Sequence, residues 1–237
     1  DLTFSTYNDR WKERDPNWKP AAYQKEQDPI RGVFAYVADG LLQPGEEAPA
    51  HQPQLLPGQV KLKNINGDDK LNEEDMVLIG RNDPKFIFGF NNNFSYKNFD
   101  LNIYMYGQVG KIAGANSYYD AWGSYGNRIK LGQNVPVSFK DAWSSDNQTS
   151  TRPSFIESAY GTGDLFLQKI SFLRIRNITL GYTVPISKSI CNRLRVYADI
   201  NNPCVWTNWK GQDPETDSNT NAYPNVTSFS IGVDISF

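Results

Sequence analysis

The alternation of hydrophobic and polar residues is clearest at the C-terminus, over residues 226–237. Every second residue from position 229 onward is apolar, and the residues between them are small or polar. A period of two is typical of a β-strand whose two faces meet different surroundings. The segment is therefore predicted to be a strand, and its apolar face is made by Phe229, Ile231, Val233, Ile235 and Phe237.

Five other segments repeat this alternation, one of them weakly. In the longest segment the apolar parity changes around Ile175, which predicts a β-bulge near Asn177. The predicted strands span residues 85–96, 100–109, 166–184 and 193–202, with residues 2–12 as the weaker candidate. We therefore expect an all-β chain with about six antiparallel strands.

The connections between these strands alternate in length. Lys97-Asn98-Phe99 and the stretch from Pro185 to Asn192 are short, whereas the others are long, at approximately residues 13–84, 110–165 and 203–225. Such long loops are uncommon in compact soluble domains, but bacterial outer-membrane barrels join short periplasmic turns to long extracellular loops. The pattern predicts part of an antiparallel transmembrane β-barrel, with its apolar face toward outer-membrane lipid and its C-terminus in the periplasm.

An antiparallel β-sandwich with one buried face would show the same alternation. It would bury Phe229, Ile231 and Val233 under a second sheet, and it would suit a secreted glycan-binding module. The barrel makes a separate prediction for the cysteines, because Cys191 and Cys204 would lie at opposite ends of one strand. At ~3.3 Å per residue they would be too far apart for a disulfide, which needs Cα atoms within ~7 Å. We therefore predict two free thiols.

Composition adds little to this picture. The net charge of −2 gives no sign of nucleic-acid binding, and no apolar run approaches the length of a transmembrane helix. Aromatic residues make up 14% of the chain, which suits β structure with elaborate loops.

Several blocks of sequence occur in one order over most of residues 30–237. The blocks are Pro57 to Asn72, Ile79 to Phe86, Phe88 to Asn92, Tyr96 to Leu101, Ser171 to Tyr182, Arg195 to Tyr197, Gly211 to Glu215, and the terminal Phe237. In this combination the chain resembles SusC/RagA-like TonB-dependent transporters of the Bacteroidetes.

The resemblance implies a complete barrel of about 22 strands, of which this chain would hold roughly the last six. It implies that the plug domain, the TonB-contacting segment and the earlier strands lie outside these residues. The implied function is active import of oligosaccharides or peptides across the bacterial outer membrane. The implied partners are a SusD-like surface lipoprotein and TonB.

The apolar positions of the last strand also resemble the signal by which barrel proteins are recognised for membrane insertion. These positions are Phe229, Ile231, Val233, Ile235 and Phe237. An ordinary amphipathic edge strand is the alternative, and the place of the pattern at the extreme C-terminus favours the insertion signal.

Residues 64–75 have the spacing of an EF-hand calcium loop. The ligand positions are Asn64, Asn66, Asp68, Lys70 through its carbonyl, Asn72 and Asp75. The loop is degenerate, because Asn64 replaces the usual aspartate and Asp69 replaces the usual glycine. Calcium is a candidate ligand, and a polar turn that kept the loop shape and lost tight binding is the alternative.

The long loops are rich in aromatic residues, whose flat rings can stack on sugars or pack against a partner protein. They can also belong to loop cores or to the aromatic belts at membrane interfaces. We expect ligand or partner contacts for some of Tyr118, Tyr119, Trp122, Trp143, Trp206 and Trp209.

Enzymatic activity finds little support in the sequence. His51, the single histidine, lies in a proline-rich stretch, and no serine has the context of a nucleophile elbow. Phosphate-binding, dinucleotide-binding and zinc motifs are missing. A glycoside hydrolase stays open as an alternative, because its two carboxylates need not be close in sequence. We predict that the chain is not an enzyme.

Overall fold

The computed structural model describes all residues except 7, 14, 115–130, 133, 135–136, 156–157, 187–190, 212 and 217–222. Six strands form one antiparallel sheet in the order β1-β6-β7-β8-β9-β10. Their bounds are Leu2–Thr6, Phe86–Tyr96, Phe99–Gly114, Leu167–Val184, Arg193–Thr207 and Ser228–Ser236. The all-β prediction is confirmed; β7 and β9 run further than expected, and β1 is shorter. The described residues contain no helix long and apolar enough to cross a membrane.

The register places like residues side by side across the sheet. On one side, hereafter the apolar face, the partners across β7, β8, β9 and β10 are Ile103, Ile178, Ile200 and Phe229. On the other side, the polar face, the neighbouring row is Asn102, Thr179, Asp199 and Ser230. Period-two alternation in each strand and antiparallel pairing between strands together produce two unlike faces.

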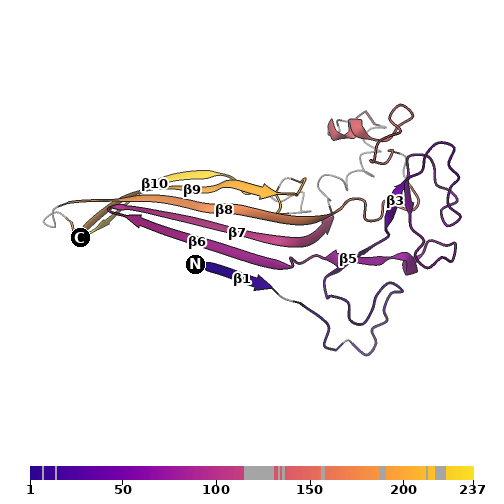
Figure 1. The fold of residues 1–237 in the computed structure, drawn as a ribbon, viewed down its shortest axis with the longest axis horizontal. Helices are drawn as coiled ribbons and strands as arrows, with labels where there is room; N and C mark the ends of the chain where they lie inside the picture. Colours follow the sequence, from indigo (N-terminus) through magenta and orange to yellow (C-terminus); the bar gives the residue numbers. More distant parts are fainter. Residues whose placement is uncertain are drawn as a thin grey trace.

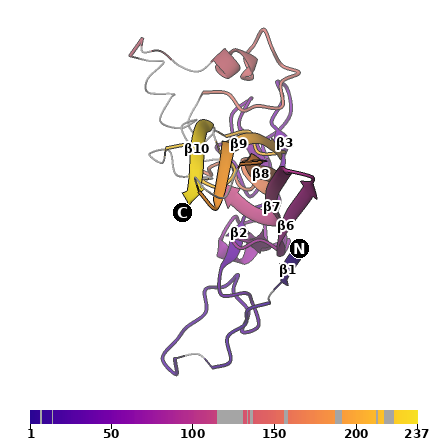
Figure 2. The same ribbon diagram turned by 90° about the vertical axis from the view of Figure 1, so that its left-hand side faces the viewer.

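The apolar face is open. Phe229 is 77% exposed and Ile231 is 83% exposed, and Leu180 and Phe94 on the neighbouring strands are also exposed. Viewed along the strands, the sheet is a single layer that runs from β10 to β1 (Figure 2). A sandwich would bury these side chains under a second sheet, so their exposure contradicts that alternative.

The two ends of the sheet differ in their connections. Lys97 and Asn98 join β6 to β7 as a two-residue turn, since Tyr96 pairs with Phe99, which therefore belongs to the strand and not to the turn. The C-terminus lies at this same end, whereas the long connections gather at the opposite end (Figure 1). The alternation of short and long connections predicted from the sequence is thus present.

The first long connection contains secondary structure of its own. β2 (Gly32–Ala35) pairs with β5 (Val77–Arg81), β3 (Ala38–Leu41) pairs with β4 (Val60–Leu62), and the short 3-10 helix η1 spans Glu73–Asp75. Leu41, Val60 and Leu62 form a core with Trp143 from the second long connection. Gly58 makes this contact possible, because a Cβ there would lie 2.2 Å from the Trp143 ring. The long loops therefore pack on one another.

Two bulges change the parity of the sheet at its loop end. Arg176 has no partner in either neighbouring strand, which confirms the bulge expected near Asn177. A second bulge lies at Gly110, whose φ is +81°. On the N-terminal side of Arg176 in β8, the even-numbered residues Ile170, Phe172 and Arg174 lie on the polar face.

Cys191 and Cys204 are free thiols, as predicted.

Candidate functional site

The polar face carries a charged cluster near its short-turn end. Arg195 of β9 donates two hydrogen bonds to Asp100 of β7, from Nε to Oδ1 at 3.0 Å and from Nη2 to Oδ2 at 2.6 Å. It also donates from Nη1 to Asp234 of β10 at 3.0 Å. A Cβ on Gly181 would lie about 2.5 Å from the guanidinium, so a larger residue there would displace Arg195 from this position. Paired charges of this kind suit a polar wall that faces water or another domain.

Side-chain amides continue this polar surface toward the middle of the sheet. Asn102 donates hydrogen bonds to the side-chain oxygens of Asn91 and Asn93, each at 2.7 Å. Asn177 donates to Asn201 across β8 and β9 at 3.0 Å. These amides therefore extend the polar face beyond the Arg195 cluster with uncharged hydrogen-bonding groups.

A buried ion pair fastens the third long connection to the polar face. Arg174 of β8 binds both carboxylate oxygens of Asp213 at 2.9 Å, and its Nε lies 3.3 Å from Glu215. Asn225 closes the other end of the same connection by donating its backbone N–H to Asp213 at 3.0 Å. The side chains of Arg174 and Asp213 are 3% and 4% exposed. We call Arg174, Asp213, Glu215 and Asn225 the loop clamp.

The two carboxylates of the loop clamp differ in acidity. Burial disfavours the charge of Asp213, but the backbone N–H groups of Glu215 and Asn225, together with Arg174, lower its pKa. Burial raises the pKa of Glu215, although the hydrogen bond from the Asn225 side chain acts to lower it. Asp213 is therefore the carboxylate that carries the negative charge paired with Arg174. This charge pair holds the loop clamp together.

The aromatic residues predicted to contact a ligand fall into different environments. Tyr118, Tyr119 and Trp122 lie outside the described residues. Trp143 and Trp209 are 9% and 6% exposed and belong to loop cores, Trp209 with Ala113 and Ile170. Both rings pack in these cores, and a ligand or partner contact through either of them stays a prediction.

Trp206 lies in β9 and not in the loop predicted for residues 203–225. It pairs with Leu173 on the apolar face and is 53% exposed. Tryptophan at the end of an exposed apolar face is typical of membrane interfaces, and ligand or partner contact by Trp206 stays a prediction.

The degenerate calcium loop is a compact polar turn. Asn64, Asn66 and Asp68 each accept a backbone N–H from within the turn, at 2.6–3.0 Å. Asp75 is fully buried and ties the two ends together, because it accepts the backbone N–H groups of Ile65 and Asn72. The described residues hold no group of three or more His, Cys, Asp or Glu side chains that could hold a metal ion. This geometry fits the polar turn, and calcium binding stays a prediction.

Replacing Asp75 with alanine should destabilise this turn, because two buried N–H groups would lose their acceptor. We expect a loss of about 1–3 kcal/mol in the free energy of unfolding. Chemical denaturation of the complete protein measures it, and Glu74→Ala, which removes an exposed neighbouring carboxylate, is the control. If calcium binds the turn, added calcium should raise the melting temperature of the wild type but not of Asp75→Ala. Equal stability of the two variants would contradict the structural role of Asp75.

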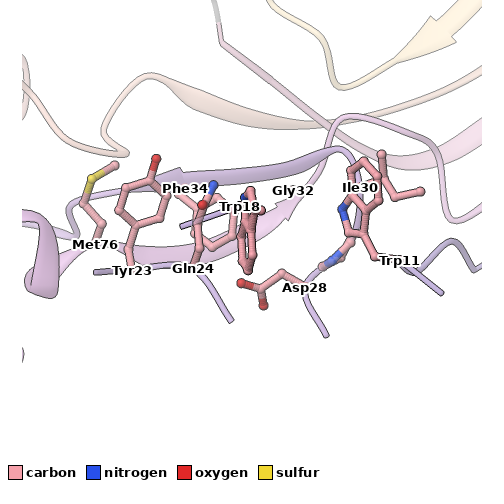
Figure 3. A pocket seen from close by; sticks show the side chains of 10 residues that line it. Trp11, Trp18, Tyr23, Gln24, Asp28, Ile30, Gly32, Phe34 and Met76 are labelled. Carbon is pink, nitrogen blue, oxygen red and sulfur yellow. The ribbon is translucent and has the colours of Figure 1, made fainter. Parts of the chain in front are cut away.

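The first long connection forms an aromatic pocket that no regular spacing in the sequence predicts. It has a volume of about 450 Å³, and Trp11, Trp18, Tyr23 and Phe34 supply its rings (Figure 3). The Tyr23 and Phe34 rings pack at 5.0 Å between centroids. Asp28 and Gln24 supply its polar side chains, and Ile30 and Met76 complete its apolar lining. Pairing of β2 with β5 brings Phe34 close to Met76, so the pocket depends on the fold of this connection.

The five apolar positions of the predicted insertion signal are all exposed on the apolar face or at its end. Phe237 is 88% exposed, and Val233 and Ile235 are more than half exposed. Recognition by an insertion machinery stays a prediction, and the exposure of these side chains leaves them accessible to it.

Comparison with known proteins shows that the chain is similar in sequence to part of several TonB-dependent receptors. No protein-family model matches it. TonB-dependent receptor P3 of Formosa agariphila is 27% identical, over 90% of this chain and 23% of the receptor. TonB-dependent receptor SusC of Bacteroides thetaiotaomicron is 26% identical, over 73% of this chain and 17% of the receptor. The chain thus spans less than a quarter of the length of these relatives.

Solved structures show the same fold. The RagAB peptide transporter matches with a TM-score of 0.68 and 22% identity, over 87% of this chain and 23% of that chain. The RagAB peptide importer in its "open-open" state matches with a TM-score of 0.64 and 22% identity. This match covers 87% of this chain and 22% of that chain. The six-stranded antiparallel sheet with its loops therefore has the architecture found in these transporters.

Proposed function

We propose that this chain, which is SusC/RagA-like in sequence and fold, is part of the wall of an outer-membrane importer of oligosaccharides or peptides. In this proposal its apolar face meets lipid and its polar face lines the interior. Its long connections face the outside of the cell and its C-terminus the periplasm. The protein transports and is not an enzyme.

The observation that carries the proposal is the single-layered sheet with two unlike faces. Side chains such as Ile231, Leu180 and Phe94 are exposed on one face, where a water-soluble protein would bury them. The opposite face holds the cluster around Arg195 and the amides around Asn102. Only closed barrels and helices satisfy backbone hydrogen bonds in lipid, so this sheet is expected to close with further strands.

The two proposed partners would act at different parts of the sheet, one at the long connections and one through the polar face. A SusD-like lipoprotein would bind the end where the long connections gather, because those connections are the large surface that a lid can contact. TonB would act through a plug domain inside the barrel, which the polar face of the sheet would contact. The names of the relatives support both partners as a proposal for the complete protein.

Labelling of single cysteines tests the orientation. In a complete protein with Cys191 and Cys204 replaced by serine, Glu47→Cys and Asn98→Cys place one thiol at each end of the sheet. Both positions are exposed. A membrane-impermeant maleimide should label Glu47→Cys on intact cells and Asn98→Cys only after the outer membrane is opened.

The outcomes separate the alternatives. A soluble module would be released from cells and would label at both positions at once. Labelling of Asn98→Cys alone on intact cells would mean that the wall is inserted in the opposite direction. Uptake of labelled oligosaccharides and peptides by cells that carry the protein, compared with cells that lack it, then tests the import itself.

A further inference from the structure

We propose that the aromatic pocket binds a neutral oligosaccharide chain. This inference rests on the proposed function, because it assigns a class of imported molecule to one site on the long connections. The pocket lies in the first long connection, between residues 11 and 34 and Met76. Nothing in the alternation of the strands requires aromatic rings there, so their gathering needs another explanation.

The size and openness of the pocket suit a chain of sugar rings. A volume of about 450 Å³ is within the range of small-molecule sites, ~300–1,000 Å³, and exceeds what one side chain of a partner protein would fill. Trp11 and Ile30 are 45% and 47% exposed, so the pocket opens to solvent at this end. An extended ligand can therefore enter the pocket and continue beyond it.

The rings lie in a row and do not surround one point. Figure 3 shows Tyr23, Trp18 and Trp11 one after another along the pocket, with Phe34 beside Tyr23. A cage for an ammonium group needs rings that converge on one cation. A row of flat rings instead offers successive stacking surfaces, and pyranose rings present successive apolar faces of C–H groups to such surfaces.

The polar side chains of the pocket suit hydroxyl groups. Asp28 uses one carboxylate oxygen to accept the Lys25 backbone N–H at 2.6 Å, and it lines the same pocket as Trp18 (Figure 3). Gln24 accepts the Ala21 N–H through Oε1, so its NH₂ group supplies donors. Both side chains are held in place by the backbone, and both can bond the hydroxyl edge of a sugar whose face lies on an indole.

The charge of the pocket favours neutral sugars over acidic ones. Among the described residues that line it, Asp28 is the one charged side chain, and no lysine or arginine is present. A uronate or a sulfated sugar would meet a carboxylate without a compensating cation. The ligand that fits is therefore a neutral, hydroxyl-rich chain.

Binding measurements on the complete detergent-solubilised protein test the assignment. The probes are maltohexaose, cellohexaose, xylohexaose and mannohexaose as neutral chains, hexagalacturonate as an acidic chain, and hexalysine and hexaalanine as peptides, each followed by calorimetry. We expect at least one neutral chain to bind, with an affinity that falls about tenfold or more in Trp18→Ala and in Trp11→Ala. Trp18→Phe keeps a ring and should restore part of the affinity. Tyr223→Ala, which removes an exposed ring from another connection, should leave binding unchanged.

The assignment is overturned if no neutral chain binds, if the acidic chain or a peptide binds in its place, or if Trp18→Ala binds neutral chains as well as the wild type does. Circular dichroism and heat-modifiable migration on gels show that each variant is folded. Because binding is measured without a membrane, it does not depend on import. A protein that binds the sugar but fails the labelling test would contradict the proposed function and leave the pocket assignment standing.

Discussion

Leu180→Arg in the complete protein should strongly reduce the amount of barrel assembled in the outer membrane. Leu180 is 51% exposed on the apolar face, where it lies between Leu101 of β7 and Ala198 of β9. If this face meets lipid, the substitution places a charge among acyl chains. Leu180 lies two residues from the row of Phe99 and Tyr182 at the short-turn end, so the expected cost, about 1–2 kcal/mol, lies between the ~2–4 kcal/mol of the membrane midplane and the ~0–1 kcal/mol of the interface. Heat-modifiable migration on gels and chemical unfolding in lipid vesicles measure the effect.

The neighbouring residue provides a matched control. Thr179 lies on the polar face opposite Asp199, so arginine there would meet water and a carboxylate. Thr179→Arg should therefore assemble much as the wild type does. Equal assembly of both arginine variants would mean that the apolar face does not meet lipid. Leu180 also lies outside the last strand, so its effect is separate from that of the predicted insertion signal.

Arg174→Ala should release the third long connection from the wall. Without the guanidinium, Asp213 remains as a buried carboxylate whose charge has lost its partner. Removing one member of a buried ion pair costs about 3–5 kcal/mol. We expect protease cleavage within residues 208–227 at concentrations that leave the wild type intact, together with a lower free energy of unfolding.

Arg176 serves as the control for the loop clamp, because it also contacts two of its members, Glu215 at 3.9 Å and the Asn225 side-chain oxygen at 3.2 Å, but is 44% exposed. Exposed ion pairs contribute little, so Arg176→Ala should change stability by about 1 kcal/mol or less. The double variant Arg174→Met with Asp213→Leu removes both charges and should recover part of the loss. If Arg174→Ala and Arg176→Ala resist protease equally, the loop clamp does not hold the connection.

The strands could be predicted from sequence wherever one face stays apolar and the other stays polar along the whole strand. β10 and the first part of β9 alternate without interruption, so their faces followed from the sequence. The extensions of β7 and β9 were missed because Gly110 and Asn202 have positive φ angles and Pro203 lacks an N–H group. Residues of these types are common at strand ends, and here they mark irregularities inside strands.

The candidate site was harder to predict because it depends on contacts between distant residues. Trp143 is a loop tryptophan by sequence, and its packing against Leu41, Val60 and Leu62 shows that it belongs to a core. Trp11, Trp18 and Tyr23 have no regular spacing, and they gain their neighbours Phe34 and Met76 through the pairing of β2 with β5. Aromatic content alone therefore does not separate rings that fill a loop from rings that line a pocket.

The bulge at Arg176 makes the number of residues in β8 as important as their identity. By the parity of Ile178, the side chains of Ile170, Phe172 and Arg174 would lie on the apolar face, and the extra residue turns them to the polar face. On the polar face Ile170 packs against Trp209, and Arg174 donates hydrogen bonds to Asp213. A deletion of one residue at this position would move the Arg174 guanidinium to the apolar face and break its contact with Asp213 in the third long connection. Homologous proteins should accordingly accept exchanges at position 176 far more readily than a change of strand length.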